Sequence, residues 1–176
     1  SVVRDIIKSL HGYVDVKSKE NHGTTFRVFI PMCDEKVNEE IKTVDNIVSG
    51  TGTLLIVDDE QMIQETLKGM LEKLNYRVFF AENGQQAVNV YRSKSKEIDA
   101  ILMDIQMPVM DGVEAAQKIL ELNPQAQIIF SSGYTEAKNF EKLRKMGYKL
   151  FLKKPYKIGS LADIIQKALS EKFLFN

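Results

Sequence analysis

The chain has 176 residues, which is enough for one well-packed core and a small appendage. Its 24 Lys and Arg residues balance 24 Asp and Glu residues, so charge gives no reason to expect nucleic acid or a membrane surface as a partner. The single cysteine, Cys33, excludes an internal disulfide and a multi-cysteine zinc site and fits a reducing, cytoplasmic compartment. No apolar run approaches the roughly 20 residues that span a bilayer.

The N-terminal part of the sequence predicts a helix followed by a β-hairpin. Apolar residues recur at helical spacing from Val2 to Leu10, and Gly12 stops the pattern. Two alternating runs, 13–18 and 24–30, follow around a turn. So small a unit cannot bury enough surface to be stable alone, so we expect its apolar face to be covered by the next domain or by protein outside this chain. The sequence opens inside a helical pattern without an initiator Met, and we expect it to belong to a longer protein.

A polar segment separates this unit from a regular α/β pattern. Residues 33–52 are polar, charged and closed by a Gly, Ser and Thr cluster, which predicts a linker, although apolar residues between Ile41 and Val48 leave a short helix open. From residue 53 onward, five apolar strand patterns alternate with five helical patterns. The predicted strands cover 54–57, 77–81, 98–104, 127–130 and 148–152. This alternation predicts an α/β fold with a doubly wound parallel sheet covered on both faces.

Polar residues follow the ends of four of these strands. They are Asp58 and Asp59, Asp104, Ser132 and Lys154. The carboxyl ends of parallel strands meet at one edge of a doubly wound sheet, so we expect these side chains to be neighbours. Crowded carboxylates favour a hard divalent cation such as Mg²⁺. A carboxylate beside such an ion can act as a nucleophile toward a phosphoryl group, with an ammonium and a hydroxyl stabilising the charge.

These motifs, in this order, resemble those of the receiver (response-regulator) domain of two-component signalling. They are the acidic pair Asp58-Asp59, the D-x-x-M-P-x-M-D-G motif from Asp104 to Gly112, Ser132 before a small residue, and Lys154-Pro155. The last bond is usually cis in this family. The resemblance covers residues 53–172 and implies a receiver domain over 53–176 with the flavodoxin-like strand order 2-1-3-4-5.

The resemblance also implies a metal site and a phosphate acceptor. Asp104 is the implied phosphoryl acceptor. Asp59 is expected to ligate Mg²⁺ directly and Asp58 through water, while Asp104 and the main-chain carbonyl of Gln106 complete the protein ligands. Phosphorylation of this kind makes the domain a conformational switch or a phosphate relay.

The same resemblance implies roles for further residues in phosphate binding, switching and dephosphorylation. Ser132 and Lys154 are expected to bind phosphoryl oxygens. Phe151 occupies the position of the family's switch aromatic, which turns inward when Ser132 moves toward the phosphate. Gln106 and Tyr134 stand where the family tunes dephosphorylation, and the bulky Tyr134 suggests a longer-lived phosphate.

Residues 1–32 resemble the last helix and the final two strands of a histidine-kinase ATP-binding domain. The resemblance rests on Gly12, the run Gly23-Thr24-Thr25-Phe26 and Pro31. It implies a hybrid histidine kinase as the parent protein, of a kind that can be anchored in a membrane upstream of this chain. The implied partner is a histidine kinase core or a histidine phosphotransfer protein. The nucleotide-binding boxes and the phosphorylated histidine of such kinases have no counterpart in this sequence. We therefore expect this chain neither to bind ATP nor to phosphorylate itself on histidine. We also expect it to make no contact with a membrane, because it has no long apolar run.

Three other functions fit the sequence less well. An aspartate-nucleophile phosphatase needs D-x-D after its first strand, whereas this chain has adjacent aspartates there. A receiver-like module that binds a partner without phosphorylation does not need all of these acidic residues, so the presence of the complete set argues against it. A DNA-binding response regulator needs an effector domain, and the sequence past the fifth helical pattern offers none.

Overall fold

The computed structural model describes residues 2–32, 50–133 and 137–173. The chain forms two compact units, residues 1–40 and 41–176. The predicted linker segment 33–49, with its apolar stripe, and Tyr134 lie outside the described residues.

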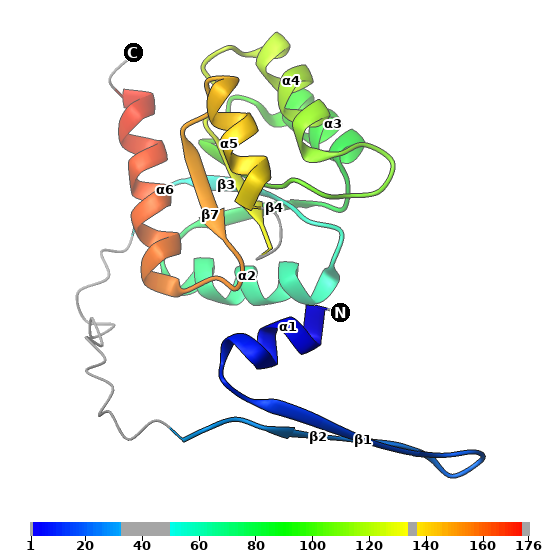
Figure 1. Cartoon of the computed structure of the whole chain (residues 1–176). Helices are drawn as coiled ribbons and strands as arrows, with labels where there is room; N and C mark the ends of the chain where they lie inside the picture. Colours follow the sequence, from blue (N-terminus) through cyan, green and yellow to red (C-terminus); the bar gives the residue numbers. More distant parts are fainter. Residues whose placement is uncertain (1, 33–49, 134–136, 174–176) are drawn as a thin grey trace. The chain divides into compact units, whose positions relative to one another are not determined.

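The first unit is the predicted helix and hairpin (Figure 1). Its elements are helix α1 (Val2–Ser9) and the antiparallel strands β1 (Tyr13–Lys19) and β2 (Gly23–Phe29). A Cβ atom on Gly12 would lie 2.3 Å from the carbonyl oxygen of Phe29, so the chain passes too close to β2 there for any other residue. The rings of Tyr13 and Phe29 stack with their centroids 4.4 Å apart.

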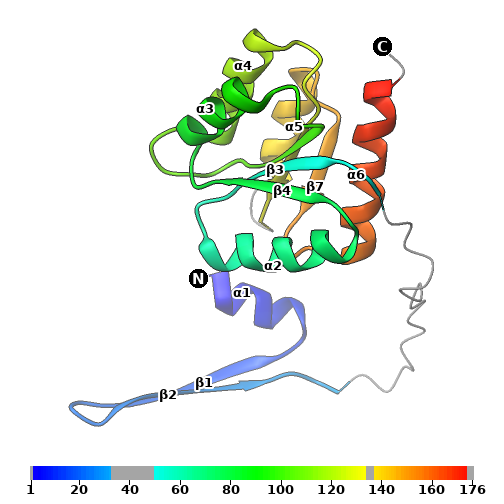
Figure 2. The same cartoon turned by 180° about the vertical axis from the view of Figure 1, so that it is seen from behind.

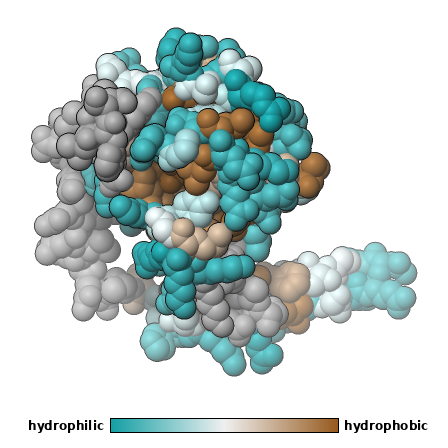
Figure 3. Space-filling view, turned by 90° about the horizontal axis from the view of Figure 1, so that it is seen from above, coloured by the Kyte–Doolittle hydropathy of each residue, from teal (hydrophilic) through white to brown (hydrophobic). Residues whose placement is uncertain are grey.

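One face of this hairpin is apolar and largely exposed. Val16 lies opposite Phe26 in the register, and their side chains are 48% and 67% exposed. Val28 and Ile30 are half exposed as well. Figure 3 shows that the turn end of the hairpin is hydrophilic, whereas apolar side chains lie nearer its open end. The first unit therefore has an apolar surface that its own described residues do not cover.

The second unit is built on a five-stranded parallel sheet. Its strands are β3 (Thr53–Val57), β4 (Arg77–Ala81), β5 (Ala100–Asp104), β6 (Ile128–Ser132) and β7 (Leu150–Lys153). Their order is β4-β3-β5-β6-β7, which is 2-1-3-4-5 within this unit. The predicted fold class and strand order are confirmed.

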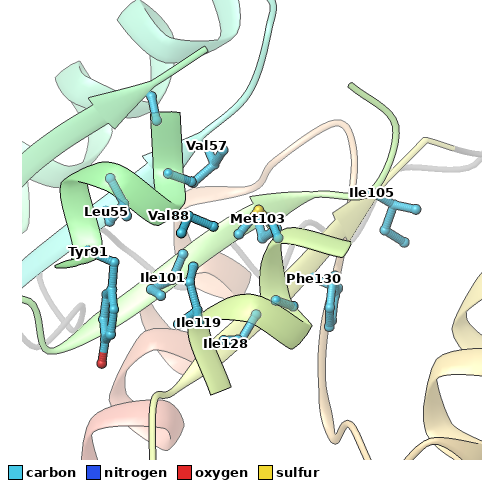
Figure 4. Packing of buried hydrophobic residues seen from close by; sticks show 14 of the residues in the cluster. Leu55, Val57, Val88, Tyr91, Ile101, Met103, Ile105, Ile119, Ile128 and Phe130 are labelled. Carbon is cyan, nitrogen blue, oxygen red and sulfur yellow. The ribbon is translucent and has the colours of Figure 1, made fainter. Parts of the chain in front are cut away.

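Helices cover both faces of the sheet (Figures 1 and 2). The helices are α2 (Gln61–Lys73), α3 (Gly84–Lys94), α4 (Gly112–Leu122), α5 (Ala137–Lys145) and α6 (Ile158–Phe173). Side chains alternate along each buried strand: in β3, Leu54 joins a core with α2 and α6, whereas Leu55 joins a core with α3, α4 and α5. The larger of these cores is shown in Figure 4. This double covering explains the continuous apolar runs in the sequence.

Local interactions set the element boundaries. Asn83 caps α3 by accepting a hydrogen bond from the backbone N–H of Gln86 at 2.9 Å. The last strand begins two residues later than predicted because the N–H of Tyr148 bonds to the carbonyl of Leu143 and so completes the end of α5. Among the described residues, no helix is both long and apolar enough to cross a membrane.

Candidate functional site

The predicted polar residues meet at the carboxyl edge of the sheet. Asp58 and Asp59 follow β3, Asp104 ends β5, Ser132 ends β6 and Lys154 follows β7. Each of the three aspartates offers a carboxylate oxygen, and these oxygens all lie within 4.8 Å of one another. We call these three residues the acid cluster. The sheet topology, which places β3, β5 and β6 side by side, brings these distant parts of the sequence together.

Lys154 links two members of the acid cluster. Its Nζ atom lies 2.7 Å from Oδ2 of Asp58 and 2.7 Å from Oδ2 of Asp104. Both carboxylates are buried, with Asp58 1% and Asp104 7% exposed. One ammonium group is therefore shared by two buried acids, an arrangement in which desolvation of the charges competes with their attraction.

Burial and pairing act in opposite directions on these groups. Burial raises the pKa of Asp104, and the hydrogen bond and charge of Lys154 only partly oppose that effect. Burial alone would lower the pKa of Lys154, but its hydrogen bonds to Asp104 and Asp58 outweigh this and raise the pKa above its usual value. Lys154 therefore stays positively charged, while the charged form of Asp104 is less favourable than in water.

The loop after β3 holds Asp58 in place and leaves Asp59 exposed. The N–H of Glu60 donates to Oδ1 of Asp58 at 3.1 Å. The side chain of Gln64, on α2, donates to the backbone carbonyl of Asp58 at 2.6 Å. Asp59 is exposed and lines a pocket together with Gln106, from the loop after β5. Asp59 is thus the member of the acid cluster that solvent and ions reach most easily.

The loop from Asp104 to Gly112 is held rigidly against the sheet. The N–H of Gly112 donates to the carbonyl of Ile105 at 3.0 Å, and a Cβ atom on Gly112 would lie 2.0 Å from the carbonyl oxygen of Asp104. Asp111 caps α4 by accepting a hydrogen bond from Glu114 N–H at 2.8 Å. The side chain of Glu114 pairs with Lys118 at 2.9 Å. These contacts fix the chain on both sides of Gln106.

Within this loop, Val109 has a strained backbone. Its φ is +70°, a left-handed value that a β-branched residue rarely adopts. The N–H of Met110 donates to the carbonyl of Pro108 at 2.8 Å, which closes a three-residue turn around Val109. The carbonyl of Met110 in turn accepts a hydrogen bond from Gly84 N–H at 3.1 Å, and Met110 is buried. The neighbours of Val109 thus hold it in this conformation.

Ser132 ends β6, and Phe151 lies in β7 beside helix α5. Ser132 is fully buried, and its carbonyl accepts a hydrogen bond from Lys154 N–H at 2.9 Å. The ring of Phe151 lies 4.9 Å from that of Phe140 on α5, centroid to centroid, and the guanidinium of Arg144 lies 5.2 Å from the Phe151 centroid. The structure therefore places Phe151 between the sheet and α5, while the Lys154–Pro155 bond is cis as expected.

Two residues at this site were missed by the sequence analysis. Ser131 and Tyr156 carry buried hydroxyl groups beside the acid cluster. The register pairs Ser131 with Asp104, and Tyr156 comes two residues after Lys154. Because side chains alternate along a strand, the sequence predicts that Ser131 and Ser132 point to opposite faces of the sheet. Ser131 belongs to none of the motifs described above.

The donor set of the acid cluster suits a hard divalent cation. Three carboxylates lie within reach of one point, and oxygen ligands of this kind are those that Mg²⁺ prefers. Nearby, Lys154 and Ser132 provide an ammonium and a hydroxyl group, which suit the oxygens of a phosphoryl group.

Comparison with known proteins identifies the family. The sequence model of the response regulator receiver domain matches residues 54–166. The chain belongs to this family. The receiver domain is 36% identical over 118 residues to the chemotaxis protein CheY of Bacillus subtilis, covering 66% of this chain and 97% of CheY. It is therefore a domain of phosphorelay signalling, and the phosphatase alternative is not favoured.

Longer relatives and solved structures agree with this family. The sensor kinase CckA of Brucella abortus is 31% identical over 184 residues, covering 98% of this chain but only 19% of CckA. The chain thus spans about a fifth of that kinase. A receiver domain from Clostridium thermocellum superposes with a TM-score of 0.68 at 25% identity, covering 71% of this chain and 99% of that one. CheY of Borrelia burgdorferi, solved with CheX, BeF3 and Mg²⁺, gives a TM-score of 0.62 at 26% identity, covering 66% and 87%.

Proposed function

We propose that the receiver domain accepts a phosphoryl group on Asp104 from a phosphohistidine donor. The observation that carries this proposal is the position of the Lys154 ammonium, 2.7 Å from Asp104 and inside the acid cluster. A carboxylate oxygen of Asp104 attacks phosphorus, the bond from phosphorus to the imidazole nitrogen breaks, and its electron pair returns to the imidazole. The product is an aspartyl phosphate.

The residues around Asp104 would assist this transfer mainly by position and charge. Asp58, Asp59, Asp104 and the main-chain carbonyl of Gln106 would hold Mg²⁺, which when bound neutralises negative charge on the phosphoryl group. Lys154 would leave its bridging position and pair with one phosphoryl oxygen. This residue is already charged and already beside the acceptor, so little reorganisation is needed.

Phosphorylation would then act on the surface of the domain. It adds roughly 1.5 to 2 negative charges at Asp104. The Ser132 hydroxyl would bond to another phosphoryl oxygen, and its movement would give room for Phe151 to turn inward, away from Arg144. The surface around α5 and β7 would shift between two populated states. Gln106 and Tyr134 would set how long the phosphate lasts.

The direct test is labelling with a small phosphodonor. Acetyl phosphate and Mg²⁺ are added to the purified chain, and the intact mass is recorded. We expect a mass gain of one phosphoryl group that is absent in Asp104→Asn. Asp111→Asn is the matched control: it changes a nearby carboxylate outside the acid cluster and should keep the label. An unlabelled folded wild-type chain, or a label that persists in Asp104→Asn, contradicts the proposal and favours a module that binds its partner without phosphorylation.

We further propose that residues 1–32 are the end of a histidine-kinase ATP-binding domain and that the parent is a hybrid histidine kinase. The alignment with CckA covers 98% of this chain, whereas that with B. subtilis CheY covers 66%, so the kinase alignment includes the first unit. The exposed apolar face of the hairpin, with Val16 and Phe26 at its centre, suits the inner face of a larger domain. A histidine kinase core or a histidine phosphotransfer protein would be the partner, in the cytoplasm.

This origin makes a separate test possible. The chain incubated with ATP and Mg²⁺ alone should take up no phosphate, because these residues include no nucleotide box. The same chain incubated with a phosphorylated histidine phosphotransfer protein should be labelled on Asp104. Labelling from ATP alone contradicts the assignment.

A further inference from the structure

Two buried hydroxyl groups beside the acid cluster lack hydrogen-bond partners of proper geometry among the described residues. They are Ser131 Oγ and the phenol oxygen of Tyr156. Ser131 is 1% exposed, and the phenol oxygen of Tyr156 is inaccessible to solvent. Nearly all buried polar groups in proteins are paired, so an unpaired one calls for an explanation. Functional sites are the places where such local costs are retained.

Both hydroxyl groups lie close to the charged groups of the site. Ser131 is the register partner of Asp104 on the adjacent parallel strand, so their side chains leave the sheet on the same face. Tyr156 packs against the core between the sheet and helices α2 and α6. Its pKa is raised to about 12, first by burial, while a poorly aligned hydrogen bond from the Ser131 hydroxyl and the charge of Lys154 act in the opposite direction. The phenol is thus a neutral hydrogen-bond donor within electrostatic reach of Lys154, Asp58 and Asp104.

The present hydrogen bonds of the carboxylates depend on Lys154. It donates to Asp58 and Asp104 at 2.7 Å each. In the proposed function, the ammonium group of Lys154 turns to a phosphoryl oxygen. Each of the two buried carboxylates then loses one hydrogen-bond donor. A buried carboxylate that loses a donor is strongly destabilised unless other groups replace it. Mg²⁺ would compensate part of this loss, and hydrogen-bond donors would compensate the rest. Ser131 and Tyr156 offer hydroxyl donors on that side of the site, because neither has a well-aligned hydrogen bond among the described residues.

We propose that Ser131 and Tyr156 are positioning residues that support the acid cluster from the sheet side when Lys154 turns to the phosphoryl group. This inference rests on the proposed function and extends it to residues that do not touch the phosphate. In the resting state neither hydroxyl group donates to a carboxylate of the acid cluster, and such bonds would form only during phosphoryl transfer. The two hydroxyl groups lower the free energy of unfolding of the resting domain, but they increase the rate of phosphoryl transfer.

The test compares three substitutions that each remove one buried, unpaired hydroxyl group. Tyr156→Phe and Ser131→Ala act beside the acid cluster. Tyr76→Phe is the matched control: its phenol is also buried and unpaired, but it precedes β4 at the opposite, amino edge of the sheet. Two quantities are measured for each variant: the urea midpoint without Mg²⁺ and the rate of labelling by acetyl phosphate at saturating Mg²⁺.

All three variants should keep or raise the urea midpoint, because each loses a buried polar group that has no well-aligned hydrogen bond. Labelling should slow by about three- to tenfold in Tyr156→Phe and in Ser131→Ala, the equivalent of one net hydrogen bond in the transition state. Tyr76→Phe should be labelled at the wild-type rate.

The inference is overturned if either Tyr156→Phe or Ser131→Ala is labelled within about twofold of the wild-type rate, a difference smaller than one net hydrogen bond supplies. An equal slowing in Tyr76→Phe overturns it too, because the effect would then belong to the fold as a whole. An unlabelled wild-type chain overturns the proposed function itself, and with it this role. Normal wild-type labelling with unaffected variants overturns only the role of the two hydroxyl groups.

Discussion

The ammonium nitrogen of Lys154 lies 2.7 Å from a carboxylate oxygen of Asp104, although 50 residues separate them in the sequence. The same nitrogen is equally close to Asp58. This one cation holds two buried acids together before any ion or phosphoryl group binds. The stability of the site and the proposed reactivity of Asp104 therefore depend on the same contacts.

The first prediction concerns Asp104→Asn in the presence of a chelator. The folded state raises the pKa of Asp104 above its ordinary value of 3.8, mainly through burial. The native state therefore holds this proton more tightly than the unfolded chain, and wild-type stability falls as pH rises through that window. Asparagine is neutral throughout. The variant should be more stable than wild type at neutral pH, and the difference should shrink as pH falls below the pKa of Asp104.

Urea unfolding at a series of pH values measures this difference. Glu121→Gln, which neutralises an exposed acid on α4, should follow the wild-type pH dependence. An Asp104→Asn chain that is less stable than wild type at neutral pH would show that the Lys154 contact outweighs burial.

The second prediction concerns Mg²⁺. An ion that binds only the native state stabilises it by about 1.4 kcal/mol at about ten times its Kd. Wild type should therefore melt at a higher temperature in Mg²⁺. Asp59→Asn should lose this increase without a loss of basal stability, because the Asp59 side chain is exposed. Calorimetry with and without Mg²⁺ measures both effects, and an undiminished increase in Asp59→Asn would remove this residue from the ligand set.

The third prediction concerns the strained turn at Val109. Its φ of +70° costs a β-branched residue about 1 to 2 kcal/mol, whereas asparagine tolerates this region. Val109 is 84% exposed, so its replacement loses little packing. Val109→Asn should raise the free energy of unfolding by about 1 kcal/mol. Val109→Thr, which is also β-branched, should give no gain, and an equal gain in both variants would locate the effect elsewhere.

The fourth prediction compares two helical glycines. Gly112→Ala should destabilise the domain by about 2 to 4 kcal/mol, because its Cβ would lie 2.0 Å from the carbonyl oxygen of Asp104. Gly69→Ala, in α2, meets nothing within 4 Å and should gain about 0.5 to 1 kcal/mol from helix propensity. Denaturant unfolding distinguishes them. A tolerated Gly112→Ala would mean that the loop after β5 can move away from the carbonyl of Asp104.

Helix caps and strand runs were predictable because they are local. Asn83 and Asp111 cap helices through bonds to residues three positions away, and the apolar run before Asp104 is a strand buried on both faces. The motifs at the strand ends also predicted which side chains would meet, since parallel strands bring their carboxyl ends to one edge. What the sequence by itself determined is thus the fold class, the strand order and the membership of the acid cluster.

Only the tertiary structure decided how these side chains share their contacts. The pairing of Lys154 with both Asp58 and Asp104, over 96 and 50 residues, depends on how closely β3, β5 and β7 approach across the sheet edge. The unpaired hydroxyl groups of Ser131 and Tyr156 follow from the same packing and have no pattern of their own in the sequence. Periodicity records which face a residue occupies, whereas hydrogen bonds depend on distances of a few tenths of an ångström that only the packed sheet and helices set.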